Sequence, residues 1–257
     1  MKLTWRSRRQ LSYLGAVLGL VLGLSLLGYG VYWLSKPPPC HDGPIGEAPP
    51  GVPICWEGVL NPHEVSDLER VWVRKFSIRP GEYTVVARFR NPNMTIGTPS
   101  LRYFVDLWGV DNELLISRPG ENFVNPGDEE VVLIETGVAR PSDPGGEVRR
   151  AEIRLDPNTP WMTNSRPLPE FRVSSRGFSN QTPARLQAEI ANLSAEVYSG
   201  IEVVVVMYDE HGNAVTASAT VVDRLEGYSS EDVHFTWPER ITPEPERIEF
   251  YPRASVF

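Results

Sequence analysis

Short apolar runs that alternate with turn residues constrain this chain more than any other feature of its sequence. In one run Tyr83, Val85, Ala87 and Phe89 occupy every second position, and this period of two predicts a β-strand with one face towards a core. Clusters of Pro, Gly and Asn separate the runs and supply turn conformations. The 24 prolines among 257 residues argue against a helical bundle, because proline interrupts helices. The predicted fold class is all-β.

The runs fall into two successive groups that resemble each other. Val105-Asp106-Leu107-Trp108-Gly109 lies 100 residues before Val205-Val206-Met207-Tyr208-Asp209, and Pro126-Gly127 lies 100 residues before Glu226-Gly227. Matches that keep their order indicate a duplicated unit of roughly 90 residues. The sequence therefore predicts two tandem immunoglobulin-like β-sandwiches, over residues 66–157 and 170–257.

The predicted linker, residues 158–169, is rich in proline and is expected to be extended and stiff. Trp161 lies within it and is expected to pack at the junction of the two sandwiches. Four other aromatic residues fall within strand patterns, so we expect core packing for them: Trp72, Trp108, Tyr208 and Trp237.

The N-terminal part of the chain has the features of a membrane anchor. No residue between positions 10 and 35 is charged, and about 20 apolar residues are enough to span a bilayer as a helix. Four cations precede this stretch within residues 1–9, which predicts a cytoplasmic N-terminus and an extracytoplasmic remainder. The alternative, a cleaved signal peptide, needs a shorter apolar region and a small-residue cleavage site. The expected location is the cell membrane, with a single pass through the lipid bilayer.

Three glycines of the predicted span recur every four residues and share one helix face: Gly15, Gly19 and Gly23. Small residues at this spacing let two membrane helices approach closely, which predicts a homodimer contact. Glycine is also common in membrane helices that make no such contact, so both interpretations remain open.

Residues 36–65 are rich in Pro and Gly and are predicted to form a stalk. The only two cysteines of the chain, Cys40 and Cys55, lie there. On the extracytoplasmic side they would form one disulfide. The alternative is half of a metal site with His41 and Asp42, but no second pair of soft ligands follows in the sequence.

Motifs across the chain also resemble a known type of domain. A predicted strand ends in Val205-x-Met207-Tyr208-Asp209, and a Gly212-Asn213 turn follows it. Further on, Gly227 precedes a strand with Phe235-x-Trp237. This series resembles the FxLYD type of β-sandwich domain. The anchor followed by Cys40-His41-Asp42-Gly43, with Phe123-Val124-Asn125-Pro126-Gly127 further on, resembles a two-domain surface protein of candidate-phylum bacteria. The resemblance implies a fold and an anchor, and it implies no activity.

The sequence offers few residues for catalysis or metal binding. It contains no Gly-x-Ser-x-Gly, phosphate loop or His-Glu-x-x-His motif, so no catalytic residue, cofactor or metal ligand is predicted. Two acidic clusters, Asp128-Glu129-Glu130 and the acids between Glu226 and Asp232, suit either calcium or solvated strand entrances. The net charge of −8 opposes binding to nucleic acid.

Two classes of function are compatible with these features. The first is a non-enzymatic surface protein that binds a protein or cell-envelope partner, since sandwiches on a stalk present loops and edges. The second is a surface hydrolase that uses strand-end carboxylates such as Asp106, Asp111 and Asp209. The architecture favours the first class, because only the number of acids supports the second.

Overall fold

The structure is a computed structural model that describes residues 23, 25, 65–139, 147–164 and 166–257. The chain forms two compact units, Met1–Trp56 and Glu57–Phe257, and all described strands belong to the second. Of the predicted span, only Gly23 and Ser25 are described, and both are helical. No helix in the described ranges is long and apolar enough to cross a membrane. The anchor, the stalk and both cysteines lie outside the described residues and stay predictions.

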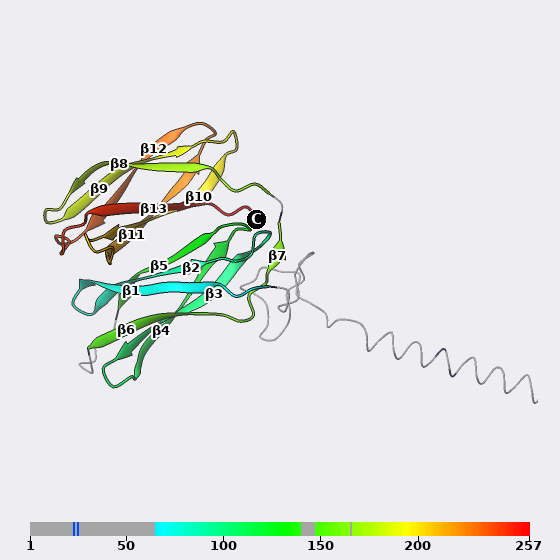
Figure 1. Cartoon of the computed structure of the whole chain (residues 1–257), viewed down its shortest axis with the longest axis horizontal. Coiled ribbons are helices and arrows are strands. Elements are labelled where there is room, and N and C mark those ends of the chain that lie inside the picture. Colours follow the sequence, from blue (N-terminus) through cyan, green and yellow to red (C-terminus); the bar gives the residue numbers. More distant parts are fainter. Residues whose placement is uncertain (1–22, 24, 26–64, 140–146, 165) are drawn as a thin grey trace, which may run out of the picture. The chain divides into compact units, whose positions relative to one another are not determined.

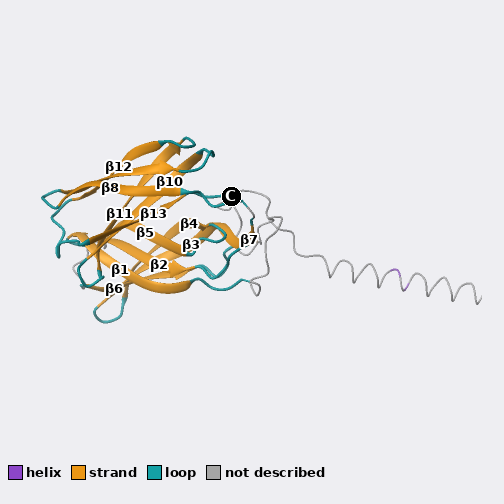
Figure 2. Cartoon of the chain, turned by 45° about the horizontal axis from the view of Figure 1, so that its top comes forward, coloured by secondary structure: helices purple, strands orange, loops and turns teal. Residues whose placement is uncertain are grey.

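The described part of the second unit consists of strands and connecting loops, as Figure 2 shows. The all-β class is therefore confirmed. The strands are β1 (Glu69–Arg79), β2 (Glu82–Arg90), β3 (Ile96–Gly109), β4 (Leu114–Val124), β5 (Glu130–Ala139), β6 (Val148–Leu155), β7 (Met162–Thr163), β8 (Phe171–Ser179), β9 (Ala184–Asn192), β10 (Tyr198–Tyr208), β11 (Ala214–Leu225), β12 (Ser230–Trp237) and β13 (Arg247–Arg253).

The strands form four antiparallel sheets, in which one topology occurs twice (Figure 1). In the first half the sheets have the orders β1-β2-β5 and β4-β3-β6. In the second half they have the orders β8-β9-β12 and β11-β10-β13, so each strand has a counterpart seven strands earlier. The turns also correspond: the amide of Asp128 donates to Asn125 O at 3.2 Å, and that of Ser229 donates to Glu226 O at 3.3 Å.

Each pair of sheets encloses its own apolar core, which makes each half β-sandwich-like. Leu101, Val105 and Leu133 are fully buried in the first core. Val205 and Ile190 are fully buried in the second. The alternating residues of the sequence supply these side chains, because every second side chain of a strand points to the same face.

A third apolar cluster lies between the two halves, and we call it the joint. Val86, Val132 and Ile134 of the β1-β2-β5 sheet pack there with Val204 and Val206 of the β11-β10-β13 sheet, and all five are buried. These two sheets therefore have apolar residues on both faces. This explains the continuous apolar runs of β2, β5 and β10, which are typical of strands covered on both sides.

The joint changes the positions expected for the aromatic residues. Three of the four aromatic residues expected in a core pack in an apolar cluster: Trp237 lies in the second core, Tyr208 is buried in the joint, and Trp72 packs against the joint. Trp108 lies on the outward face of the β4-β3-β6 sheet, with the guanidinium of Arg150 4.5 Å from its ring centre.

The segment between the two halves is attached to the first of them. Met162 and Thr163 form β7, which pairs with Gly97 and Ile96 of β3. Trp161 packs against the first core and is not part of the joint, the apolar cluster between the halves, where the sequence predicts it. The segment thus combines an extended backbone with direct pairing to β3.

Candidate functional site

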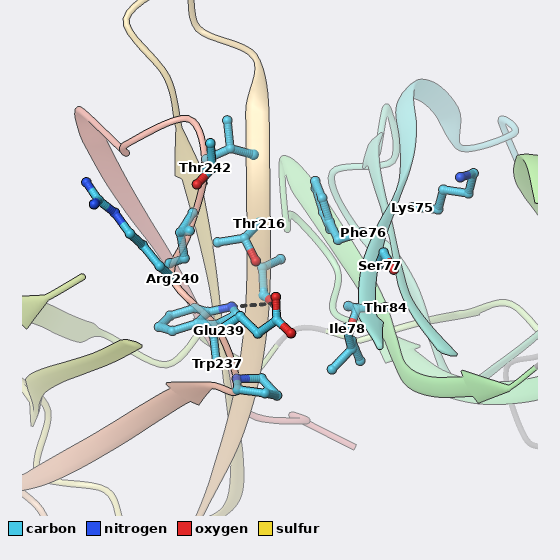
Figure 3. Close-up of a pocket in the computed structure, with 14 residues that line it drawn as sticks. Lys75, Phe76, Ser77, Ile78, Thr84, Thr216, Trp237, Glu239, Arg240 and Thr242 are labelled. Carbon is cyan, nitrogen blue, oxygen red and sulfur yellow. Dashed lines mark hydrogen bonds between the residues drawn. The ribbon is translucent and has the colours of Figure 1, made fainter. Parts of the chain in front are cut away.

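A cavity of about 470 Å³ lies between the two halves, beside the joint (Figure 3). One wall consists of Lys75, Phe76, Ser77 and Ile78 of β1 together with Thr84 of β2. The other wall consists of consecutive residues of β11 and of the segment that ends β12: Val215, Thr216, Ala217, Trp237, Pro238, Glu239, Arg240, Ile241 and Thr242. A volume of this size falls within the range of small-ligand sites, about 300–1,000 Å³.

Two buried hydroxyl groups, one on each wall, give the cavity its polar character. Thr84 is 4 % exposed and Thr216 is 7 % exposed. Among the described residues neither hydroxyl has a protein hydrogen-bond partner, but neither oxygen is one of the fully buried polar atoms left without a partner, so both can bond to water in the cavity. An occupant of the cavity would replace that water at both hydroxyls.

The charged groups around the cavity point in different directions. Glu239 extends from its wall towards the space in front of Thr84 and Ile78, as Figure 3 shows, and no ion pair involves it within the described ranges. Arg240 pairs instead with Glu244 at 3.4 Å. The ammonium of Lys75 lies 5.0 Å from the ring centre of Tyr83. Neither Glu239 nor Lys75 forms an ion pair in the described part of the chain, but the ammonium of Lys75 is directed away from the cavity and the carboxylate of Glu239 towards it (Figure 3).

The joint next to the cavity contains a buried ion pair. The Arg253 side chain of β13 is 5 % exposed and lies 3.0 Å from Glu202 Oε2 on β10. The same guanidinium donates to Asn122 Oδ1 and Val132 O, both at 3.1 Å. These acceptors belong to β4 and β5, so a single arginine connects both sheets of the first half to the second.

A side-chain amide holds the chain after β13 against the first half. Asn125, 1 % exposed, donates to Ala254 O at 2.9 Å and accepts from the amide of Val256 at 3.1 Å. Asp128 follows in the same turn, and burial raises the pKa of its carboxyl although Arg253 acts in the opposite direction. The two halves are thus joined by apolar packing, an ion pair and a backbone clamp.

Two tyrosines form the polar border of the joint. The hydroxyls of Tyr208 and Tyr251 lie 3.3 Å apart, and Tyr251 donates to Glu249 at 2.6 Å. Burial raises the pKa of both phenols, and for Tyr251 the hydrogen bond to Glu249 raises it further. Both tyrosines therefore act as neutral hydrogen-bonding groups.

The carboxylates considered for a hydrolase lie in separate structural settings. Asp106 is buried in the middle of β3, where it bonds to Ser117 and pairs with Arg154 at 3.3 Å. Asp111 lies in the exposed β3–β4 turn. Asp209 accepts the amides of His211 and Asn213 at 2.9 and 2.8 Å, and the hydrogen bonds from Asn213 lower its pKa. The carboxylates of Asp106 and Asp209 are therefore engaged within a sheet and a turn, while that of Asp111 lies at the surface.

The first acidic cluster is occupied by contacts within the protein. Asp128 accepts from the amide of Asn125 at 3.2 Å, and Glu130 forms an ion pair with Arg88. In the described part of the chain, no three acidic, histidine or cysteine side chains converge as metal ligands. Of the residues expected to mark functional positions, Gly15, Gly19, Cys40 and Cys55 lie outside the described residues.

Sequence patterns alone did not reveal Thr84, Thr216 or the cavity. The available signal was the uninterrupted run of apolar residues in β2, β5 and β10, which marks sheets covered on both faces. That signal indicates that a second sheet packs on the outside, but not which one. The neighbouring threonines carry no pattern of their own.

Comparisons with known proteins do not place the chain in a family. No family model matches it, and none of the curated proteins matches it. Among solved structures it is similar to a β-glucuronidase from Bacteroides uniformis, with a TM-score of 0.21 and 11 % sequence identity. That similarity covers 64 % of this chain and 22 % of the β-glucuronidase chain.

Proposed function

We propose that this chain is a membrane-anchored extracytoplasmic protein with a non-enzymatic binding role. In this proposal two tandem immunoglobulin-like sandwiches of the FxLYD type, residues 66–157 and 170–257, form the binding part. Residues 10–35 hold it in the bilayer, with the N-terminus in the cytoplasm. Residues 36–65 form the stalk, closed by a Cys40–Cys55 disulfide.

The cavity between the halves is the observation that carries the binding role. It is lined by two buried threonines, Thr84 and Thr216, which come from different halves. Polar groups held in this way on a fixed scaffold are suited to recognition, because they need little reorganisation when a partner binds. The joint supplies that scaffold through the buried pair of Arg253 and Glu202.

A binding role also agrees better with the carboxylates than hydrolysis does. A hydrolase needs an acid and a base that converge on one substrate bond. Asp106 and Asp209 belong to different halves, and each is already engaged by neighbouring groups. Gly15, Gly19 and Gly23 would add a dimer contact within the bilayer, which brings two binding sites together.

Site-specific photo-cross-linking tests the proposal. A photoreactive phenylalanine analogue at Ser77 lines the cavity, and the same analogue at Gln187 on the exposed face of β9 provides the control. In membranes from cells that express the full chain, we expect a cross-linked partner with the analogue at position 77 only. Equal cross-linking at both positions, or none at position 77, contradicts the proposed binding site.

A further inference from the structure

We propose that the cavity binds an extended peptide segment with a basic side chain, which pairs with the edge of β1. This inference rests on the proposed binding role of the same cavity and identifies the chemical class of the partner. Three observations carry it: the two strands that border the cavity, the buried hydroxyls and the direction of Glu239.

Both strands that line the cavity are edge strands. β1 is the outer strand of the β1-β2-β5 sheet, and β11 is the outer strand of the β11-β10-β13 sheet. Consecutive residues of each border the cavity, 75–78 and 215–217. If the cavity faced only one side of a strand, every second residue of that strand would line it. Because consecutive residues line it, we infer that the backbone edge of each strand faces the cavity.

The free backbone groups of an edge strand pair readily with another extended chain. Peptide recognition by strand addition uses this property, with pockets for alternate side chains. Of the two edges, that of β11 is partly occupied, because Trp237 Nε1 donates to Ala217 O at 3.3 Å (Figure 3). The edge of β1 is therefore the one that the peptide joins.

Thr84 lies on β2 opposite Phe76, one strand away from the edge of β1, so its hydroxyl is placed to bond to a side chain of such a peptide and not to its backbone. Thr216 lies on the facing wall, and a hydroxyl can donate to or accept from a polar side chain. Phe76 and Ile78 add apolar surface on the β1 side of the cavity. The two hydroxyl groups and the apolar side chains of Phe76 and Ile78 together suit an extended peptide with side chains of moderate size.

The charge of the cavity selects a basic side chain. Glu239 points into the cavity, while the cations nearby are directed to other partners: Arg240 to Glu244 and Lys75 to Tyr83. A Lys or Arg side chain of the peptide would pair with Glu239, which is exposed at the border of the cavity, and such a pair contributes more to the choice of partner than to affinity. The net charge of −8 also attracts basic partners over longer distances.

Selection from a phage-displayed library of random linear dodecapeptides against the purified full chain tests this inference. We expect enriched peptides to contain Lys or Arg and to lose about two- to fivefold in affinity with Glu239→Gln and about two- to tenfold with Thr84→Val. Thr84→Ser keeps the hydroxyl and should retain the affinity, and Glu189→Gln on the opposite sheet of the second half is the matched control. Enriched peptides that lack basic residues, or that bind all variants equally, overturn the inference.

N-methylation of the enriched peptides checks strand pairing separately from charge. Methylation at alternate amides should abolish binding and methylation between them should not, because only every second amide faces the edge of β1. Uniform tolerance rules out strand addition. If Ser77 cross-links a partner in membranes while no peptide is selected, the proposed function stands and the peptide inference fails.

Discussion

Arg253 is a single buried side chain that bonds to both halves of the molecule. It is almost completely buried, and it bonds to Glu202, Asn122 and the carbonyl of Val132. Removing one partner of a buried pair leaves the other charge without compensation. The stability of the joint therefore depends on this residue more than its position near the end of β13 suggests.

Arg253→Ala is expected to lower the free energy of unfolding by about 3 kcal/mol, since it leaves the largely buried carboxylate of Glu202 without its cation. Chemical denaturation of the purified full chain measures the change. Arg224→Ala is the control, because Arg224 is 64 % exposed and pairs with Glu226 at the surface, where a pair contributes about 0–1 kcal/mol. Similar losses for both variants would show that the joint does not depend on the buried pair.

Asp128 should make stability depend on pH in an unusual direction. Burial raises its pKa in the folded state, so the charged carboxylate opposes folding above that pKa, and the penalty disappears as pH falls below the pKa of the unfolded chain. Asp128→Asn is expected to raise the melting temperature at pH 7, with a difference that shrinks towards about pH 3. A difference that is constant or grows on acidification contradicts this assignment.

At the level of elements, hydrogen bonds between two loops fix one end of the second half. In the second half Asn192 donates to Glu196 O and Glu226 O at 2.7 and 3.1 Å, which holds the loop after β9 against the turn after β11. Gly227 lies in that turn, and a Cβ there would overlap the carbonyl oxygen of Ala195. The close approach of two backbones explains why glycine occupies the position.

Gly227→Ala should therefore destabilise the protein by about 1–3 kcal/mol, the usual range for overpacking. Gly177→Ala in β8 is the matched control, since a Cβ there meets nothing within 4 Å. Thermal unfolding followed by far-UV circular dichroism compares the two variants. The role assigned to Gly227 is wrong if both variants melt at the same temperature.

The outward face of the β4-β3-β6 sheet is the counterpart of the face that the second half uses in the joint. Arg150 lies over Trp108 at 4.5 Å, just as Arg247 lies over Tyr208 at 4.4 Å. The centre differs: Asp106 and Arg154 stand where β10 and β13 have Val206 and Tyr251. Polar residues at these two positions prevent a third sheet pair from stacking there.

Restoring the apolar pattern with Asp106→Val and Arg154→Tyr is thus expected to cause self-association. The exposed face would then resemble the one that is buried in the joint, and contiguous exposed apolar surface drives association. Sedimentation velocity over a range of concentrations measures it, with Arg154→Lys as the control that keeps the charge. A double variant with the same sedimentation coefficient as the unmodified chain would disprove this explanation.

At the scale of the whole molecule, neighbouring residues of one strand serve different interfaces. Val205 and Val206 are both fully buried in β10, but Val205 faces the second core and Val206 faces the joint. An aspartate at either position would be unpaired and desolvated. The consequences differ because the second core belongs to one half alone, whereas the joint is shared by both halves.

Val205→Asp is expected to unfold the second half, whereas Val206→Asp should separate the halves and leave both cores folded. Far-UV circular dichroism measures the strand content, and small-angle scattering measures the radius of gyration of the full chain. The first variant should lose about half of the β signal, and the second should keep it with a larger radius. Complete unfolding by Val206→Asp would mean that neither half persists without the joint.

The sequence by itself determined the strands and turns, since alternation and turn chemistry are local. Val105 and Val205 occupy matching positions in β3 and β10 and are both fully buried, as the repeat predicts. The tertiary structure alone decided which outer faces meet. Trp108 and Tyr208 have equivalent local patterns, yet one is stacked under Arg150 at the surface and the other packs in the joint. The physical reason is that contact between two sheets depends on the complementary shape and charge of residues far apart in the chain. The alternation of apolar residues within one strand does not identify the sheet that packs against it.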